Sequence, residues 1–203
     1  MKKARRKNSK HVLLFVDASH FVMGSDFLGG IYGKARRFVR TFSGRQRYNV
    51  LGAINYITKK VTTVTNDTYI TASEVCDLLR CVAEEYAGKV IHLALDNARY
   101  QKCVVVQDLA QSLGIDLVYI PPYSPNLNLI ERLWRFVKGK LRSKYYNDFS
   151  VFTKTIDGII DSTVGPYQAE IQSLIGTKIQ LFDDLQELCT NTFARQTKPQ
   201  KAA

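Results

Sequence analysis

The chain has 203 residues, which suits one large domain or one domain with a small helical appendage. Its composition, 45% hydrophobic and 11% aromatic, is sufficient for a sizeable core, and no apolar run approaches the length of a membrane span. The net charge of +11 is uneven, because residues 1–147 carry 24 Lys and Arg against 11 Asp and Glu, whereas residues 148–203 carry 5 against 7. This asymmetry indicates that the excess of Lys and Arg serves to bind a polyanionic partner and not only to keep the protein in solution. The four cysteines form no C-x-x-C pair, and we expect a cytoplasmic protein without a membrane partner.

The first predicted elements are strands. Residues 11–18 form a continuous apolar run, which is typical of a central strand covered on both faces. Strand patterns over 48–57 and 61–65 are separated by three residues and predict a hairpin. The glycine-punctuated segment between the first strand and this hairpin is strongly basic: it contains Lys34, Arg36, Arg37, Arg40, Arg45 and Arg47.

Helices and strands alternate beyond residue 70. Thr71 and Glu74 have the spacing of a capping box, and apolar residues then recur at helical spacing as far as Gly88, the predicted helix end. The elements predicted after it are strand 90–95, helix 98–113 ended by Gly114, strand 116–120, a helix that bears Glu131, and helices over 149–162 and 167–188.

This order predicts an α/β fold. Its mixed sheet has three antiparallel strands first and parallel strands afterwards, flanked by helices, which is the element order of an RNase H-like fold. We expect a basic tail over residues 1–10, the sheet-containing domain over 11–162, and a helical C-terminal extension with a polar tail over 163–203.

Three carboxylates stand where strands end or a helix begins. Asp17 and Asp96 each close an apolar strand, and ligands bind at the carboxyl edge of open α/β sheets. Glu131 follows a third strand and a proline-rich loop. Together they predict one site for divalent ions, which take oxygen ligands and can promote phosphodiester cleavage. For the Asp96-Asn97 pair alone, a turn or helix cap is the alternative.

The helix that bears Glu131 has two distinct sides, at about 100° per residue. Its apolar side contains Ile130, Leu133, Trp134, Val137 and Leu141. A separate stripe within about 60° contains Glu131, Arg135, Lys138 and Arg142. One helix would therefore present a carboxylate at the sheet rim with three phosphate-binding cations behind it. The alternative is an ordinary Glu–Arg surface pair.

The loop over residues 121–128 has three prolines in five positions, which restricts how the chain approaches Glu131. Ser124, Asn126 and Asn128 are candidate caps for the following helix, with DNA contact as the alternative. Two further possible contributors to the site are Asn97, beside Asp96, and His20, three residues after Asp17. A loop histidine is more often structural than functional.

The stretches LALDNARYQ and YIPPYSPNLNLIERLW, with 34 residues between Asp96 and Glu131, resemble the DDE catalytic domain of mariner-type transposases, specifically their bacterial insertion-sequence branch. FVDASHF is similar to the segment that carries the first acid of that family, and SGRQRYNVLGAINYIT to its second-strand region. The resemblance covers residues 11–155, roughly three quarters of the chain.

This resemblance implies an RNase H-like enzyme that uses two Mg2+ or Mn2+ ions to cleave DNA at transposon ends and to transfer the freed 3′ ends into target DNA. Asp17, Asp96 and Glu131 would be its catalytic and metal-binding residues. Arg36, Arg37, Arg45, Arg47, Arg135, Lys138 and Arg142 would bind DNA. The family also implies a homodimer on DNA and a helix-turn-helix region for end recognition. A separate N-terminal chain is one candidate source of that region; the alternatives are that this chain is a fragment or a decayed copy.

Two other functions remain open from the sequence. One is a different RNase H-like nuclease, for example one that acts on RNA–DNA hybrids without strand transfer. The other is a catalytically idle DNA-binding protein derived from a transposase, which would bind DNA with a steep salt dependence and no metal-dependent chemistry.

Overall fold

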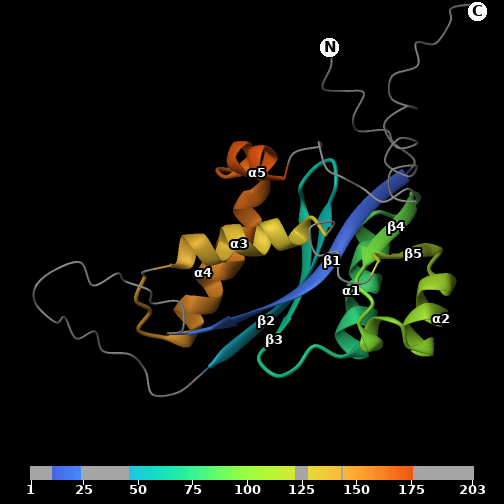
Figure 1. Ribbon diagram of the computed structural model, residues 1–203, viewed down its shortest axis with the longest axis horizontal. Coiled ribbons are helices and arrows are strands. Elements are labelled where there is room, and N and C mark those ends of the chain that lie inside the picture. The colour runs from blue at the N-terminus through green and yellow to red at the C-terminus, as the bar shows by residue number, and fades with distance from the viewer. Residues whose placement is uncertain (1–10, 24–45, 122–127, 143, 176–203) are drawn as a thin grey trace, which may run out of the picture.

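The structure, a computed structural model, describes residues 11–23, 46–121, 128–142 and 144–175. At its centre lies a five-stranded sheet in the order β3-β2-β1-β4-β5 (Figure 1). The first three strands pair antiparallel, and β1, β4 and β5 run parallel, which confirms the predicted mixed sheet. The strands are β1 (His11–Val22), β2 (Arg47–Asn55), β3 (Val61–Asn66), β4 (Val90–Leu95) and β5 (Ile115–Tyr119).

The central strand β1 extends well beyond its parallel neighbour. Its pairing with β4 ends at Phe15↔Ala94, whereas its pairing with β2 continues to Val22↔Arg47. β1 therefore runs four residues past the predicted end at residue 18, because the hairpin strand supports it. From residue 16 onwards, the other edge of β1 has no strand partner in the part of the chain that the structure describes. Asp17 lies in this part of β1.

Helices cover both faces of the sheet (Figure 1). On one face lie α1 and α2, and on the other α3, α4 and α5. The helices are α1 (Ala72–Glu85), α2 (Val104–Ser112), α3 (Ile130–Leu141), α4 (Phe149–Asp161) and α5 (Gln168–Leu174), with short 3-10 turns η2 (Arg99–Gln101) and η4 (Ser162–Val164). Within the described residues, no helix combines the length and apolarity needed to cross a membrane.

The predicted boundaries of α1 are confirmed by local geometry. Thr71 and Glu74 form the reciprocal capping box, and Gly88 follows the helix with a φ of +76°, which favours glycine. Gly114 has the same role after α2, with a φ of +67°. The single helix predicted over 98–113 is wrong over residues 98–103. There the chain forms η2, and Cys103 is extended before α2 begins.

The break before α2 coincides with a buried polar residue. Gln101 is 1% exposed, and its backbone oxygen accepts a hydrogen bond of 3.2 Å from the Tyr119 hydroxyl on β5. This contact holds η2 against the sheet, so the chain turns before the helix starts. The later helix predicted over 167–188 is observed as α5, and residues 176–188 lie outside the described part of the chain.

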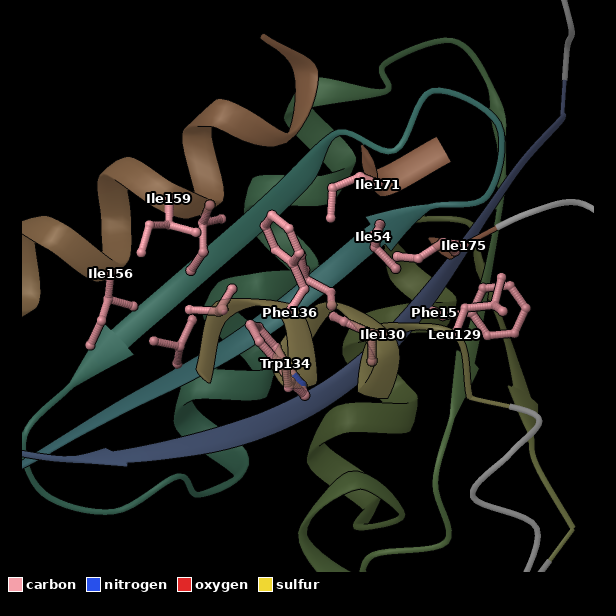
Figure 2. Packing of buried hydrophobic residues seen from close by; sticks show 14 of the residues in the cluster. Phe15, Ile54, Leu129, Ile130, Trp134, Phe136, Ile156, Ile159, Ile171 and Ile175 are labelled. Carbon is pink, nitrogen blue, oxygen red and sulfur yellow. The ribbon is translucent and has the colours of Figure 1, made fainter. Parts of the chain in front are cut away.

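Alternate residues of β1 supply two hydrophobic clusters, one on each face of the sheet. Leu13 and Phe15 pack with α3, α4 and α5, whereas Leu14 and Val16 pack under α1 and α2. Figure 2 shows Trp134 from α3 among the buried side chains of the first cluster. Each fully buried side chain of this size contributes about 1.5–3 kcal/mol, so α3 is held firmly on the sheet.

Candidate active site in a basic groove

Three acidic side chains come from three elements that meet beside the open edge of β1. Asp17 lies in β1 just after the buried run, directly opposite Gly52 of β2. Asp96 is the first residue after β4, and because β1 and β4 are parallel, both acids lie towards the same edge of the sheet. Glu131 is in the first turn of α3, next to Ile130, which belongs to the apolar side that packs on the sheet.

The carboxylates oppose one another's ionisation. Burial raises the pKa of Asp17 to about 7, and the charges of Asp96 and Glu131 add to this rise, while the Ala18 backbone N–H and the Trp134 indole oppose it. The indole nitrogen lies beside the carboxylate but makes no hydrogen bond of good geometry. Burial followed by repulsion from Asp96 also raises the pKa of Glu131, and burial raises that of Asp96. Such a cluster favours a nearby cation.

Asn128 connects the three elements that carry the acids. Its Nδ2 donates to the backbone oxygen of Val16 at 3.1 Å and, less closely, to Oδ1 of Asp96 at 3.4 Å. Its backbone oxygen accepts from the Glu131 N–H at 3.3 Å. The predicted helix-capping role of Asn128 is wrong, because Leu129 is the N-cap residue and α3 has no side-chain cap. The side chain instead fixes the spacing between β1, the end of β4 and the start of α3.

Asp17 and Glu131 line a cavity of about 490 Å3 between β1 and α3, which we call the α3 groove. One wall is β1, and the other is the predicted helix stripe. The groove is lined by Asp17, Ala18, Ser19, His20, Glu131, Trp134, Arg135, Lys138, Gly139 and Arg142. The ammonium of Lys138 lies 5.6 Å from the ring centroid of Phe21, so β1 also positions a cation of the opposite wall. Along α3, one carboxylate is thus followed by three cations, as the stripe predicts.

The groups present fit a divalent metal ion by chemistry and charge. Asp17, Asp96 and Glu131 supply the carboxylate oxygens that Mg2+ prefers. Asn128 adds a neutral oxygen, because its Oδ1 is buried and has no hydrogen-bond partner among the described residues. No three His, Cys, Asp or Glu side chains in the described ranges stand close enough to enclose an ion as they are placed. The site is therefore a set of suitable ligands rather than a finished cage.

A protein-family model described as DDE superfamily endonuclease matches residues 12–153, most of the chain and all three acids. The chain belongs to the DDE superfamily endonucleases. No curated protein matches it in sequence. Membership of this family, with the site geometry above, supports a nuclease of the transposase type.

Solved structures show the same fold for this DDE domain. The catalytic domain of Mos1 mariner transposase matches at a TM-score of 0.57 with 14% identity, covering 98% of this chain and 89% of that chain. The catalytic core of HTLV-2 integrase in complex with magnesium matches at a TM-score of 0.50 with 15% identity, covering 79% of this chain and 89% of the integrase chain. In the Mos1 paired-end complex with the left transposon end, the match has a TM-score of 0.56 and 12% identity, covering 88% of this chain and only 63% of the transposase chain. The fold is thus that of the RNase H-like catalytic cores.

The remaining predicted site residues of the DDE domain are placed as follows. His20 lines the α3 groove, as do Arg135, Lys138 and Arg142. Asn97 donates from Nδ2 to the backbone oxygen of Ile120, which ties the ends of β4 and β5 together. Arg47 lies opposite Val22 at the far end of the β1–β2 pair, exposed and outside the lining of the groove. Five predicted residues lie outside the described part of the chain: Arg36, Arg37, Arg45, Ser124 and Asn126.

Sequence reasoning missed two residues beside the acids. Tyr100 of η2 lies near Asp17 and Asp96. Burial raises the pKa of its hydroxyl, and the charges of these two acids raise that pKa further. Gly52 faces the Trp134 ring so closely that a side chain there would collide with it. A glycine inside a strand pattern is a recognised sign of close approach, so Gly52 could have been found. For Tyr100, no periodicity or motif gave a signal.

Proposed function

We propose that this DDE domain is a transposase catalytic domain that cleaves DNA at transposon ends and transfers the freed strands into target DNA. The observation that carries the proposal is that Asp17 and Glu131 line a groove rich in cations, with Asp96 near enough for its charge to act on both. Acids of this kind hold divalent ions, and the cations that follow them suit a phosphate backbone. We place the chain in the bacterial insertion-sequence branch on the motif around Glu131.

Asp17, Asp96 and Glu131 would hold two Mg2+ or Mn2+ ions. Such ions supply activation of a water or 3′-hydroxyl nucleophile and stabilise charge on the departing oxygen. The protein's own contribution is placement. Asn128 holds the end of β4 against β1, and the packing of Trp134 holds α3, so the three carboxylates keep their relative positions.

The α3 groove would hold one DNA strand beside the acids. From Glu131 to Arg142 the helix rises about 16 Å, which is the axial length of roughly five nucleotides of one B-form strand. Arg135, Lys138 and Arg142 would neutralise phosphates along this length. The basic residues Arg36, Arg37, Arg45 and Arg47 are proposed as further DNA contacts, with a homodimer on paired ends and a separate helix-turn-helix chain as partners.

The test is cleavage of supercoiled plasmid DNA with Mg2+ or Mn2+ and with EDTA. Wild type is compared with Glu131→Gln, and with Glu170→Gln as a matched control, because Glu170 is an exposed α5 residue that pairs with Lys140 and does not line the α3 groove. We expect metal-dependent nicking that Glu131→Gln loses and Glu170→Gln retains. Nicking that survives in Glu131→Gln would contradict the assigned site.

Substrate choice separates the proposal from its rivals. A transposase joins a pre-cut 3′ end to plasmid DNA, so we expect covalent joining of a labelled oligonucleotide in the presence of Mn2+. Cleavage of an RNA–DNA hybrid without any joining would indicate a different RNase H-like nuclease. DNA binding without cleavage of any substrate would indicate the catalytically idle protein.

A further inference from the structure

Two cavities lie on opposite sides of α3 and share part of its surface. The α3 groove lies between α3 and β1. A second cavity of about 770 Å3, which we call the α5 cavity, lies between α3 and α5. Figure 1 shows α5 and β1 on opposite sides of α3. Because Arg135 and Gly139 line both cavities, a ligand that leaves the α3 groove across α3 at these residues enters the α5 cavity.

Gly139 is the low point between the two cavities. It is an exposed residue of α3 that follows Arg135 and precedes Arg142 by about one helical turn, so both arginines lie on the same side of the helix. An added Cβ would meet nothing within 4 Å among the described residues, so packing does not require a glycine here. Glycine destabilises a helix interior, but it allows a ligand to approach the backbone closely. The position therefore suits a phosphodiester backbone that crosses α3 between two cations.

The α5 cavity has an apolar floor. Phe136 of α3 and Leu174 of α5 both line it, and 40% of the Leu174 surface is exposed. Two contacts hold α5 against α3 at this place. Arg132 donates from Nη1 to the backbone oxygen of Leu174 at 3.3 Å, and the rings of Phe136 and Tyr167 meet edge to face with centroids 5.4 Å apart. The cavity is therefore built into the packing of the two helices.

The net positive charge of the α5 cavity comes from α3. Nζ of Lys140 donates to Oε2 of Glu170 at 2.9 Å and lies 4.9 Å from the ring centroid of Phe136, so this lysine is engaged within the protein. With this ion pair balanced, Arg135 supplies the remaining charge of the lining. Proteins that bind single strands combine cations for the backbone with aromatic and apolar surface for the bases. The α5 cavity has this combination.

We propose that the nucleic-acid strand bound in the α3 groove crosses α3 at Gly139 and that the α5 cavity binds its unpaired bases. This inference rests on the proposed function of the groove. Unpaired nucleotides can turn their bases into an apolar cavity, whereas the bases of a duplex are already paired and stacked. Gly139 lies about 12 Å beyond Glu131 along the helix axis, roughly three or four nucleotides from the carboxylates. The α5 cavity therefore acts in binding and not at the reacting phosphate.

The test uses two variants of the full chain, each with a matched control. Gly139→Ala adds a methyl group at the crossing point, and Gly158→Ala adds one to α4, where it also meets nothing within 4 Å and lines neither cavity. Ser173→Glu adds a negative charge to the lining of the α5 cavity, and Gln172→Glu adds it to the neighbouring exposed position outside that lining. Affinity is measured for fluorescent DNA of about 15 nucleotides, single-stranded and as a blunt duplex, a length beyond the roughly five nucleotides that α3 spans. Urea denaturation reports the stability of each variant.

Both glycine variants should raise the urea midpoint, because alanine favours a helix more than glycine does. Only Gly139→Ala should weaken single-strand binding, by roughly three- to tenfold, because its methyl group holds the backbone away from the helix. Ser173→Glu should weaken single-strand binding by a similar factor through repulsion and leave duplex affinity unchanged. Gln172→Glu should change either affinity by less than about twofold, since solvent screens an exposed charge.

Equal single-strand affinity in Gly139→Ala and Gly158→Ala would overturn the crossing at Gly139. Equal affinity in Ser173→Glu and Gln172→Glu would overturn the α5 cavity as a binding site, and a lowered urea midpoint of Ser173→Glu alone would then show that protein fills it. An equal loss of duplex affinity in Ser173→Glu would overturn the assignment to unpaired bases. These results would leave the proposed function intact, whereas no DNA binding by wild type would overturn that function as well.

Discussion

Replacement of Gly52 by alanine should shift α3 without changing any of its side chains, and so test whether the position of α3 controls activity. A Cβ at this position would lie 2.8 Å from Cη2 and 3.0 Å from Cζ2 of Trp134, and 3.1 Å from Cδ1 of Ile130. Carbon atoms pack at about 3.5–4.0 Å, so something must move by roughly 0.7 Å or more. Trp134 is 4% exposed and Ile130 0%, so neither can turn into solvent. The strain must shift α3 away from β2.

The expected cost follows from this geometry. Overpacking of a well-filled core costs about 1–3 kcal/mol of unfolding free energy. Glu131 adjoins Ile130, so the same shift moves its carboxylate relative to Asp17, which lies opposite Gly52. A misplacement of about 1 Å can lower a rate on the order of a hundredfold, so the nicking rate of the folded variant should fall by about that factor.

Urea denaturation and the plasmid-nicking rate measure the two effects of Gly52→Ala. The matched control is Gly158→Ala in α4, where an added Cβ meets nothing within 4 Å. In a helix interior this change should stabilise by about 0.5–1 kcal/mol and leave nicking unchanged. Wild-type stability and wild-type nicking in Gly52→Ala would refute the argument that close approach at this glycine positions the site.

Three further outcomes are expected. Lys138→Ala should weaken DNA binding at all sequences and reduce the slope of log affinity against log salt by about 0.9, and an unchanged slope would remove Lys138 from the phosphate contacts. Burial raises the pKa of Asp17 from 3.8 to about 7 in the folded state, so without divalent ions stability should fall as pH rises through that window. The unfolding free energy of Asp17→Asn should then exceed that of wild type on the order of 2 kcal/mol at pH 8, and the two values should become equal below pH 3.8. Equal melting of the two proteins at pH 8 would contradict the burial argument. Tyr48→Phe removes a hydroxyl that donates to both carboxylate oxygens of Asp157, at 2.8 and 3.0 Å, and should cost about 1.5–3 kcal/mol in urea denaturation, whereas no loss would show that this bond does not hold α4 to β2.

Much of the fold could be predicted because its signals are local. The capping of α1 by Thr71, the ends of helices at Gly88 and Gly114, and the position of Asp96 directly after β4 each depend on a few neighbouring residues. The apolar run before Asp17 predicts that this acid closes its strand as well, but it lies within β1, which continues to Val22. The two sides of α3 also follow from helical spacing alone, and the structure places its stripe along the groove.

What could not be predicted depends on contacts between residues far apart in the sequence. The Asn128 side chain bonds the backbone of Val16, 112 positions away, so a local reading suggested a helix cap instead. The orientation of His20 depends on Asn49, which is adjacent only once β1 and β2 pair. The turn before α2 results from burial of Gln101 against β5, and no pattern within the segment signals it.

The central claim is that Asp17, Asp96 and Glu131 form one divalent-ion site. Binding of Mn2+ measured by electron paramagnetic resonance, in wild type and in Asp17→Asn, Asp96→Asn and Glu131→Gln, tests it most directly. The account predicts Mn2+ binding by folded wild type that each single substitution weakens by tenfold or more, as expected on the order of 1.4 kcal/mol or greater for a lost charged ligand. Undiminished Mn2+ binding in all three folded variants would contradict it.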